Sequence, residues 1–295
     1  MRLLSLFITL WLTSTIAAQT PTTPAKTEKS GSYKYLLYLP DKYKDDKDKP
    51  WPLIIYLHGK SACGNNLAKV RRYGLPFYLD RDMKVDAVVA APQCPMGKNW
   101  VTDNWFITFL DDIKKKYHID ENRIYLTGMS LGGFGTFSLA IKYPDLFAAV
   151  SPFCGGGQPQ TVAPMKDVPT WVFHGDRDEQ VPLRRSQEMV DAIKKCGGNP
   201  KFTILKGMPH DIHRNYNNPE LYEWMLSHSK NGPVYATKVP ELNTDTTIKA
   251  EVVAKAPKEA PLPKSKAQKQ RRRKAEQAKE EEKIEESEKM KFKFE

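Results

Sequence analysis

A serine enclosed by glycines is the first group in this chain that suggests chemistry. The stretch GMSLG (residues 128–132) centres on Ser130, which follows a buried-strand pattern, RIYLTG, and precedes a helical pattern. Serine needs a positioned base to act as a nucleophile at neutral pH. A sharp strand-turn-helix connection is the context that exposes such a serine, and glycines relieve crowding at the turn. The pattern alone leaves a plain glycine-rich loop open, whereas this context favours a catalytic Ser130.

Two loops further along the chain supply candidates for the base and for the acid that orients it. Asp176 and Asp178 follow the strand pattern PTWVFHG, and His210 follows KFTILKGMP. This is the order, acid before histidine, that a serine on a strand-turn-helix connection requires. Asp178 is preferred because it lies farther into its loop, whereas Asp176 is placed to cap the turn. His210 is the histidine that comes after the acid in such a loop, so we predict a triad of Ser130, Asp178 and His210.

An oxyanion hole should complete this site. One donor is expected to be the backbone N–H of Leu131, the residue after the nucleophile, and the other an N–H in the loop after the strand PLIIYLHG. Lys60 is the nearest candidate in that loop. Because only its N–H is needed, its side chain is free for solvent or for an acidic group of the substrate.

Metal and cofactor chemistry has little support in the sequence. His210 and His213 have suitable side chains, but no further ligands lie nearby at metal-binding spacing. We therefore predict no metal and no organic cofactor.

Strand and helix patterns alternate through the middle of the chain. Apolar strand patterns occupy residues 32–39, 52–59, 86–92, 123–128, 146–157, 169–176 and 201–207. Helical patterns occupy residues 65–74, 103–120, 130–144, 183–198 and 217–229. This alternation predicts an α/β fold with a mostly parallel sheet, helices on both faces and no large cap domain. Ligands bind such a sheet at the carboxyl ends of its strands.

The first 31 residues have the composition of an export signal and a linker. Arg2 precedes an apolar run over residues 3–12, and small residues follow at Ala17 and Ala18. This pattern predicts a signal peptide over residues 1–18 and secretion or a periplasmic location; an uncleaved anchor or a buried strand is the alternative. A Thr/Pro/Lys linker is expected over residues 19–31, and no transmembrane segment is expected after cleavage.

Export also bears on the cysteines, since disulfides persist in oxidising compartments. Up to two disulfides are possible, and three pairings remain open. The four cysteines are Cys63, Cys94, Cys154 and Cys196.

The last segment, residues 230–295, differs in composition from the rest. It holds 17 Lys and Arg against 12 Asp and Glu, without an apolar stripe. We expect a disordered or solvated-helix tail. Its basic run at residues 271–274 offers a contact for an anionic surface, whereas nucleic acid is not an expected partner of an exported chain.

Several stretches between residues 32 and 229 resemble the α/β-hydrolase superfamily. They are LHGK, APQCP, LTGMSLGGFGT, YPDLFAAVSPFCGGG, HGDRDEQVP and GMPHDIHRNY. They look most like secreted bacterial esterases of the dienelactone-hydrolase, phospholipase/carboxylesterase and feruloyl-esterase-like groups, often labelled predicted peptidases. The resemblance implies the same triad and the same oxyanion donors. The chain departs from it in the cleft, where Lys60, Cys63, Ile212 and His213 replace the usual residues.

These observations predict an exported serine hydrolase that cleaves carboxylic esters through an acyl-enzyme. An open cleft suits acyl groups on polysaccharides, so an acylated polysaccharide is the substrate considered first. Two alternatives remain open: a serine peptidase of the prolyl-oligopeptidase type, and a non-catalytic binding protein on the same fold.

Overall fold

The structure is a computed structural model that describes residues 25–31, 33–46 and 48–232. All of these residues fall within one compact unit. The predicted signal peptide and nearly all of the predicted tail, with its basic run, lie outside the described residues.

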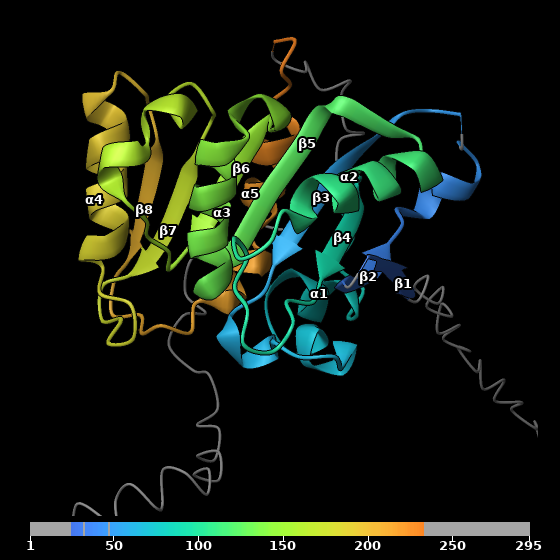
Figure 1. The fold of residues 1–295 in the computed structure, drawn as a ribbon, viewed down its shortest axis with the longest axis horizontal. Helices are drawn as coiled ribbons and strands as arrows, with labels where there is room; N and C mark the ends of the chain where they lie inside the picture. The colour runs from blue at the N-terminus through green and yellow to red at the C-terminus, as the bar shows by residue number, and fades with distance from the viewer. Residues whose placement is uncertain (1–24, 32, 47, 233–295) are drawn as a thin grey trace, which may run out of the picture. The chain divides into compact units, whose positions relative to one another are not determined.

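One eight-stranded sheet forms the centre of the described part (Figure 1). The strands are β1 (Lys26–Ser30), β2 (Tyr33–Tyr38), β3 (Trp51–Leu57), β4 (Val88–Pro92), β5 (Ile119–Met129), β6 (Ala149–Phe153), β7 (Trp171–Gly175) and β8 (Lys201–Leu205). Their order is β1-β2-β4-β3-β5-β6-β7-β8. The pairs β1–β2 and β2–β4 are antiparallel and the other pairs are parallel. The predicted mostly parallel sheet is confirmed.

Helices cover both faces of this sheet (Figure 1). The α-helices are α1 (Gly74–Leu79), α2 (Trp105–Lys116), α3 (Leu131–Lys142), α4 (Arg184–Lys195) and α5 (Pro219–Leu226). Buried side chains of α2, α3 and α4 share one hydrophobic core, and those of α1 and α5 share the other. The two cores lie on opposite sides of the sheet, as predicted.

Short 3₁₀ helices connect these elements. They are η1 (Asp41–Lys44), η2 (Lys60–Ala62), η3 (Leu67–Arg72), η4 (Pro144–Leu146), η5 (Pro159–Thr161), η6 (Ala163–Met165) and η7 (His213–Asn217). In the described part, none of the connections forms a separate cap domain over the sheet.

Burial explains why the central strands have continuous apolar sequences. Every residue of β3 and of β4 is buried, because helices pack on both faces of these strands.

In α5, Asn218 precedes the first turn and its side chain accepts a hydrogen bond from the Glu220 N–H at 3.1 Å. Pro219 occupies the first helical position, where no backbone N–H is needed. Both features favour the start of a helix at this position, within the segment 217–229 that was predicted to be helical.

Two predicted segments differ from the structure. Residues 26–30, assigned to the linker, form strand β1, which pairs with β2 along its whole length. This edge strand is held by backbone pairing and has mostly exposed polar side chains, so its sequence lacks an apolar signal. The helix expected over residues 65–74 is the 3₁₀ helix η3, and α1 begins at Gly74, where the predicted helix ends.

All four cysteines are free thiols, so the possible disulfides are not formed in the structure. The side chains of Cys63 and Cys94 are buried. Within the described ranges, no helix is both long and apolar enough to cross a bilayer.

Candidate active site

Ser130 lies on a strained turn between β5 and α3. Its φ of 58° and ψ of −117° are rare for a residue with a side chain, and such strain is typical of functional sites. Its N–H donates to the Phe153 carbonyl at 2.9 Å, which ties the turn to β6. A Cβ on Gly128 would lie 2.6 Å from the Gly132 carbonyl oxygen, and one on Gly132 would lie 1.8 Å from the Leu57 oxygen. Glycine is therefore required on both sides of the serine.

The three residues predicted as a triad lie within hydrogen-bond distance of one another. Ser130 Oγ is 2.9 Å from His210 Nε2, and His210 Nδ1 is 2.7 Å from Asp178 Oδ2. Each follows the carboxyl end of a different parallel strand: β5, β7 and β8. Because these ends meet at one edge of the sheet, residues far apart in the chain converge there.

The hydrogen-bond partners define the protonation of His210. The Asp178 carboxylate only accepts, so Nδ1 carries the proton, and in the neutral ring Nε2 is left to accept from the Ser130 hydroxyl. A histidine in this form is a general base aimed at the serine. The arrangement can therefore remove the proton from Ser130 as its oxygen attacks a carbonyl.

Asp178 is nearly fully buried and accepts three hydrogen bonds, and His174 lies beside it. The N–H groups of Gln180 and Val181 donate to Oδ1 at 2.9 and 2.8 Å, while His210 at 2.7 Å and His174 at 3.2 Å face Oδ2. Burial alone raises the pKa of Asp178, but the hydrogen bonds from Val181, His210 and Gln180 outweigh it, and the net pKa lies below its ordinary value. The carboxylate is thus ionised when His210 becomes charged.

Asp176, the other carboxylate considered as the acid, does not contact His210 and is bonded to a turn instead. Its Oδ1 accepts a hydrogen bond from the Gly207 N–H at 2.6 Å and its side chain is exposed. It therefore holds the turn after β8 to the end of β7, the capping position that the sequence suggested for it.

The two predicted oxyanion donors occupy equivalent places in the backbone. Leu131 begins α3 and Lys60 begins η2, and the first N–H groups of a helix have no partner within it. His58 supports the Lys60 loop: Nδ1–H donates to the Gly59 carbonyl at 2.7 Å and Nε2 accepts from the Cys94 N–H at 3.0 Å. Burial lowers the pKa of His58 to about 4, so this histidine is neutral.

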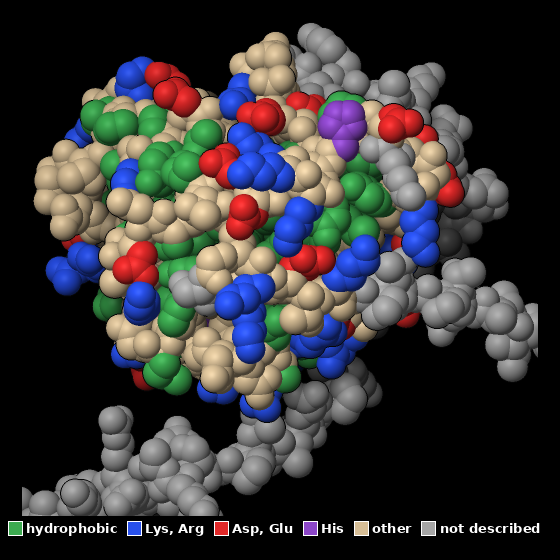
Figure 2. Space-filling view, turned by 45° about the vertical axis from the view of Figure 1, so that its right-hand side comes forward, with side chains coloured by type: hydrophobic (Ala, Val, Ile, Leu, Met, Phe, Trp, Pro, Cys, Tyr) green, Lys and Arg blue, Asp and Glu red, His purple; other side chains and the backbone are tan. Residues whose placement is uncertain are grey.

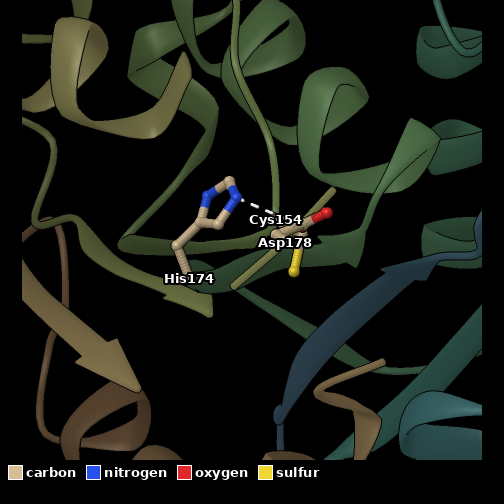
Figure 3. Close-up of side chains that lie close together, drawn as sticks. All are labelled: Cys154, His174 and Asp178. Atoms are coloured by element: carbon tan, nitrogen blue, oxygen red, sulfur yellow. Dashed lines mark ion pairs between the residues drawn. The ribbon is translucent and has the colours of Figure 1, made fainter. Parts of the chain in front are cut away.

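A second buried histidine lies behind the triad, in a cluster with Cys154 and Asp178 (Figure 3). His174 Nε2–H donates to the Val181 carbonyl at 2.8 Å and faces Asp178 Oδ2, while Nδ1 is 2.7 Å from Ser186 Oγ. Ligand atoms of the three clustered residues lie within 4.8 Å of one another, close enough for a metal ion. However, each already has a protein hydrogen-bond partner, and burial raises the pKa of the Cys154 thiol. We assign the cluster to support of Asp178.

An open pocket of about 250 Å³ leads to Ser130 and His210. Apolar and aromatic side chains form part of its wall, and charged side chains form another part. The lining residues are Tyr56, His58, Gly59, Lys60, Ser61, Ala62, Lys69, Val70, Tyr73, Met129, Ser130, Gln180, His210 and Asp211. Of the predicted site residues, Lys60, Ser130 and His210 line the pocket, Asp178 lies behind His210, and Leu131 begins the helix beside it.

The sequence did not identify Lys69, Tyr73 or Asp211 as pocket residues. Lys69 belongs to η3 and Tyr73 to the segment before α1, and no strand pattern places them near the serine. Asp211 pairs with the ring of His213, which packs against Tyr73 and the neighbouring aromatic residues of α1. The only sign in the sequence that Asp211 lies at the pocket is that it directly follows His210.

The comparisons with known proteins agree with this geometry. Residues 101–216 match the family model described as Phospholipase/Carboxylesterase. The chain is 27% identical over 222 residues to poly(3-hydroxyalkanoate) depolymerase C of Paucimonas lemoignei, a match that covers 58% of this chain and 52% of that protein. It is 28% identical over 163 residues to Probable feruloyl esterase C of Aspergillus clavatus, covering 48% of this chain and 58% of that protein.

A solved structure of a thermostable esterase is 32% identical, with a TM-score of 0.61, and the match covers 70% of this chain and 63% of that one. The chain thus spans little more than half the length of the two curated relatives. The sheet order, the helices on both faces and these similarities show that the protein has the α/β-hydrolase fold and resembles the esterases of that fold.

Proposed function

We propose that this protein is a serine hydrolase that cleaves carboxylic esters through Ser130, His210 and Asp178. The observation that carries the proposal is the pair of hydrogen bonds that links Ser130 Oγ to His210 Nε2 and His210 Nδ1 to Asp178. The similarity to esterases supports an ester rather than another acyl compound as the substrate.

The proposed reaction has two halves. His210 Nε2 takes the hydroxyl proton of Ser130 as Oγ bonds to the ester carbonyl carbon, and the N–H groups of Leu131 and Lys60 donate to the oxyanion. The C–O bond to the alcohol then breaks, and the His210 proton goes to the departing oxygen. Water attacks the acyl-enzyme with His210 again as base, which releases the acid and restores Ser130. Asp178 orients the ring and stabilises its charged form throughout.

The finer parts of the proposal concern substrate and location. The two curated relatives are named as a poly(3-hydroxyalkanoate) depolymerase and a feruloyl esterase, and both names describe cleavage of esters. Together with the open pocket, these names support acyl groups on a polymer, such as a polysaccharide, as the substrate. We further propose that the chain is exported by its first 18 residues; this segment, like the tail, lies outside the described residues.

The test compares the protein with its Ser130→Ala variant on para-nitrophenyl acetate, feruloylated and acetylated xylan, and a peptide library. We expect ester hydrolysis that falls by at least about 10⁴-fold in the variant. We also expect a fluorophosphonate probe to label the unaltered protein at Ser130. Unchanged hydrolysis in the variant would contradict the mechanism, turnover of peptides alone would favour a peptidase, and absence of labelling would favour a binding protein.

A further inference from the structure

Two lysines line the active-site pocket without an acidic partner. Lys60 begins η2, and Lys69 lies in η3 on the same side of the pocket. Neither forms an ion pair with a residue in the described ranges, where five other lysines do: Lys84, Lys98, Lys114, Lys116 and Lys166. Figure 2 shows one face of the molecule, where Lys and Arg side chains are interspersed with Asp and Glu. The pocket therefore has positive charge available for a ligand.

Both lysines are tied to the backbone of Cys63, and the Lys60 carbonyl accepts a hydrogen bond from the Cys63 N–H at 3.2 Å. Lys69 Nζ is 3.5 Å from the Cys63 carbonyl oxygen, and Lys69 is only partly exposed. Burial raises the pKa of the Cys63 thiol, and the charges of Lys60 and Lys69 both oppose that rise. Both lysines are thus held near Cys63, which follows the proposed oxyanion loop directly.

The remaining ionisable groups of the pocket do not cancel this charge. The one carboxylate in the lining, Asp211, accepts a hydrogen bond from His213, which lowers its pKa, so it supplies one negative charge against the two positive charges of Lys60 and Lys69. His58 is buried and neutral. The wall that Lys60 and Lys69 form consequently remains positive at neutral pH.

An apolar wall shares the pocket with these lysines. Tyr56 and Val70 are buried, Met129 is 9% exposed, and Tyr73 is 46% exposed. A ligand that fills both parts would combine an apolar or aromatic body with a negatively charged group. The carboxylate is a common small anionic group of esters, and lysine binds a carboxylate through its compact, mobile charge.

We propose that the pocket selects esters that carry a carboxylate close to the scissile carbonyl, and that Lys60 and Lys69 bind this carboxylate. The inference rests on the proposed ester hydrolysis and defines its substrate class. The Lys60 N–H is a proposed oxyanion donor, so the side chain of the same residue starts beside the reacting carbonyl. Its ammonium group can reach a carboxylate in either the acyl or the alcohol part of the ester.

The test uses two pairs of esters that differ only in charge. Para-acetoxybenzoate and para-acetoxybenzamide place the group in the alcohol part, and the para-nitrophenyl esters of adipic acid and adipamic acid place it in the acyl part. We expect the charged member of at least one pair to have the higher kcat/KM at low salt. In Lys69→Gln this ratio should fall about threefold and in the Lys60→Gln/Lys69→Gln double variant about tenfold, mainly through KM.

Two controls separate this inference from general charge effects. Lys115→Gln removes an exposed lysine of α2 that does not line the pocket, and it should leave the ratio unchanged. Added salt should reduce the preference, because it screens charges that are open to solvent. Equal ratios in the unaltered protein and the double variant, in both ester pairs, would overturn the inference while leaving ester hydrolysis intact.

A binding measurement keeps the inference testable if the protein hydrolyses no ester. Calorimetry with the Ser130→Ala variant should show tighter binding of para-hydroxybenzoate than of para-hydroxybenzamide. Adding Lys60→Gln and Lys69→Gln to that variant should remove the difference. An equal affinity for the two ligands before those substitutions would refute the carboxylate site by a route that does not depend on catalysis.

Discussion

Burial and three hydrogen-bond donors distinguish Asp178 from the other carboxylates near the site, Asp176 and Asp211. A buried carboxylate with donors on both oxygens has one fixed orientation, and it transmits that orientation to the ring of His210. Asp176 is two residues earlier in the same loop but is exposed and bonded to a turn. The two aspartates thus lie in the same loop, but only Asp178 is buried and bonded to His210.

This difference gives a prediction for the two aspartates. Asp178→Asn should lower kcat by about 10⁴-fold, because an amide at that place favours the wrong tautomer of His210. Asp176→Asn should change kcat by less than about threefold, since the Gly207 N–H can bond to an amide oxygen equally well. Steady-state kinetics on para-nitrophenyl acetate checks both. A larger loss in Asp176→Asn than in Asp178→Asn would reverse the assignment of the acid.

The sequence was sufficient to predict that Ser130, Asp178 and His210 lie together, because each follows a recognisable strand in the required order. It was not sufficient for Lys69 or Asp211. Lys69 reaches the pocket through a 3₁₀ helix, which has no distinctive apolar period. The position of Asp211 at the pocket depends on how Ile212 is buried and how His213 packs among aromatic residues, neither of which local sequence specifies.

At the scale of elements, the close approach of α3 to the sheet positions the nucleophile. The first turn of α3 lies against the end of β3, so close that no side chain fits at Gly132. The same contact holds Leu131 and the Lys60 loop next to each other, on the two sides of the proposed oxyanion site. The glycines after Ser130 therefore set the spacing between two elements as well as the shape of the turn.

We predict that Gly132→Ala lowers the free energy of unfolding by about 3 kcal/mol, the upper end of the cost of overpacking a close contact. Gly59→Ala is the matched control, since its Cβ would meet only ordinary contacts at 3.5 Å. That variant should stay within about 1 kcal/mol of the unaltered protein. Urea unfolding followed by tryptophan fluorescence measures both, and equal stability of the two variants would contradict the contact argument.

Helices and strands could be predicted from the sequence where their burial requires apolar residues in a run or at helical spacing. The apolar runs of β3 and β4 and the helical spacing in α2 reflect packing on both faces of the sheet. Strand β1 and helix α1 were not predictable for local reasons. β1 is held by backbone pairing, and Gly74, with a φ of +66°, reads as the end of a helix although it begins one.

At the scale of the whole molecule, neutral buried histidines make stability depend on pH. His58 has a pKa of about 4 in the folded protein and an ordinary value of 6.5. The unfolded chain therefore binds more protons than the folded protein between these values. The stability that neutral His58 contributes is therefore fully present above pH 6.5 and is lost as the pH falls toward 4. His174, whose pKa burial also lowers, acts in the same direction.

We predict that the free energy of unfolding is about 2 kcal/mol lower at pH 5 than at pH 7 from His58 alone, at about 1.4 kcal/mol per pH unit. Urea unfolding at the two pH values measures the difference. His118→Gln, which removes an exposed histidine, should keep the same dependence on pH. A free energy of unfolding that is equal at pH 5 and pH 7 would show that His58 is not held neutral.

The triad joins strands that differ in how firmly the sheet holds them. β5, which leads to Ser130, pairs with a neighbour on each side, whereas β8, which leads to His210, is an edge strand with Ile204 43% exposed. Amide hydrogens at a sheet edge exchange through small local openings, and those at the centre exchange only when the whole domain opens. On heating, β8 is thus the first of the two to detach. We therefore expect heat inactivation to begin with displacement of His210, the proposed base, while Ser130, the proposed nucleophile, is still in place.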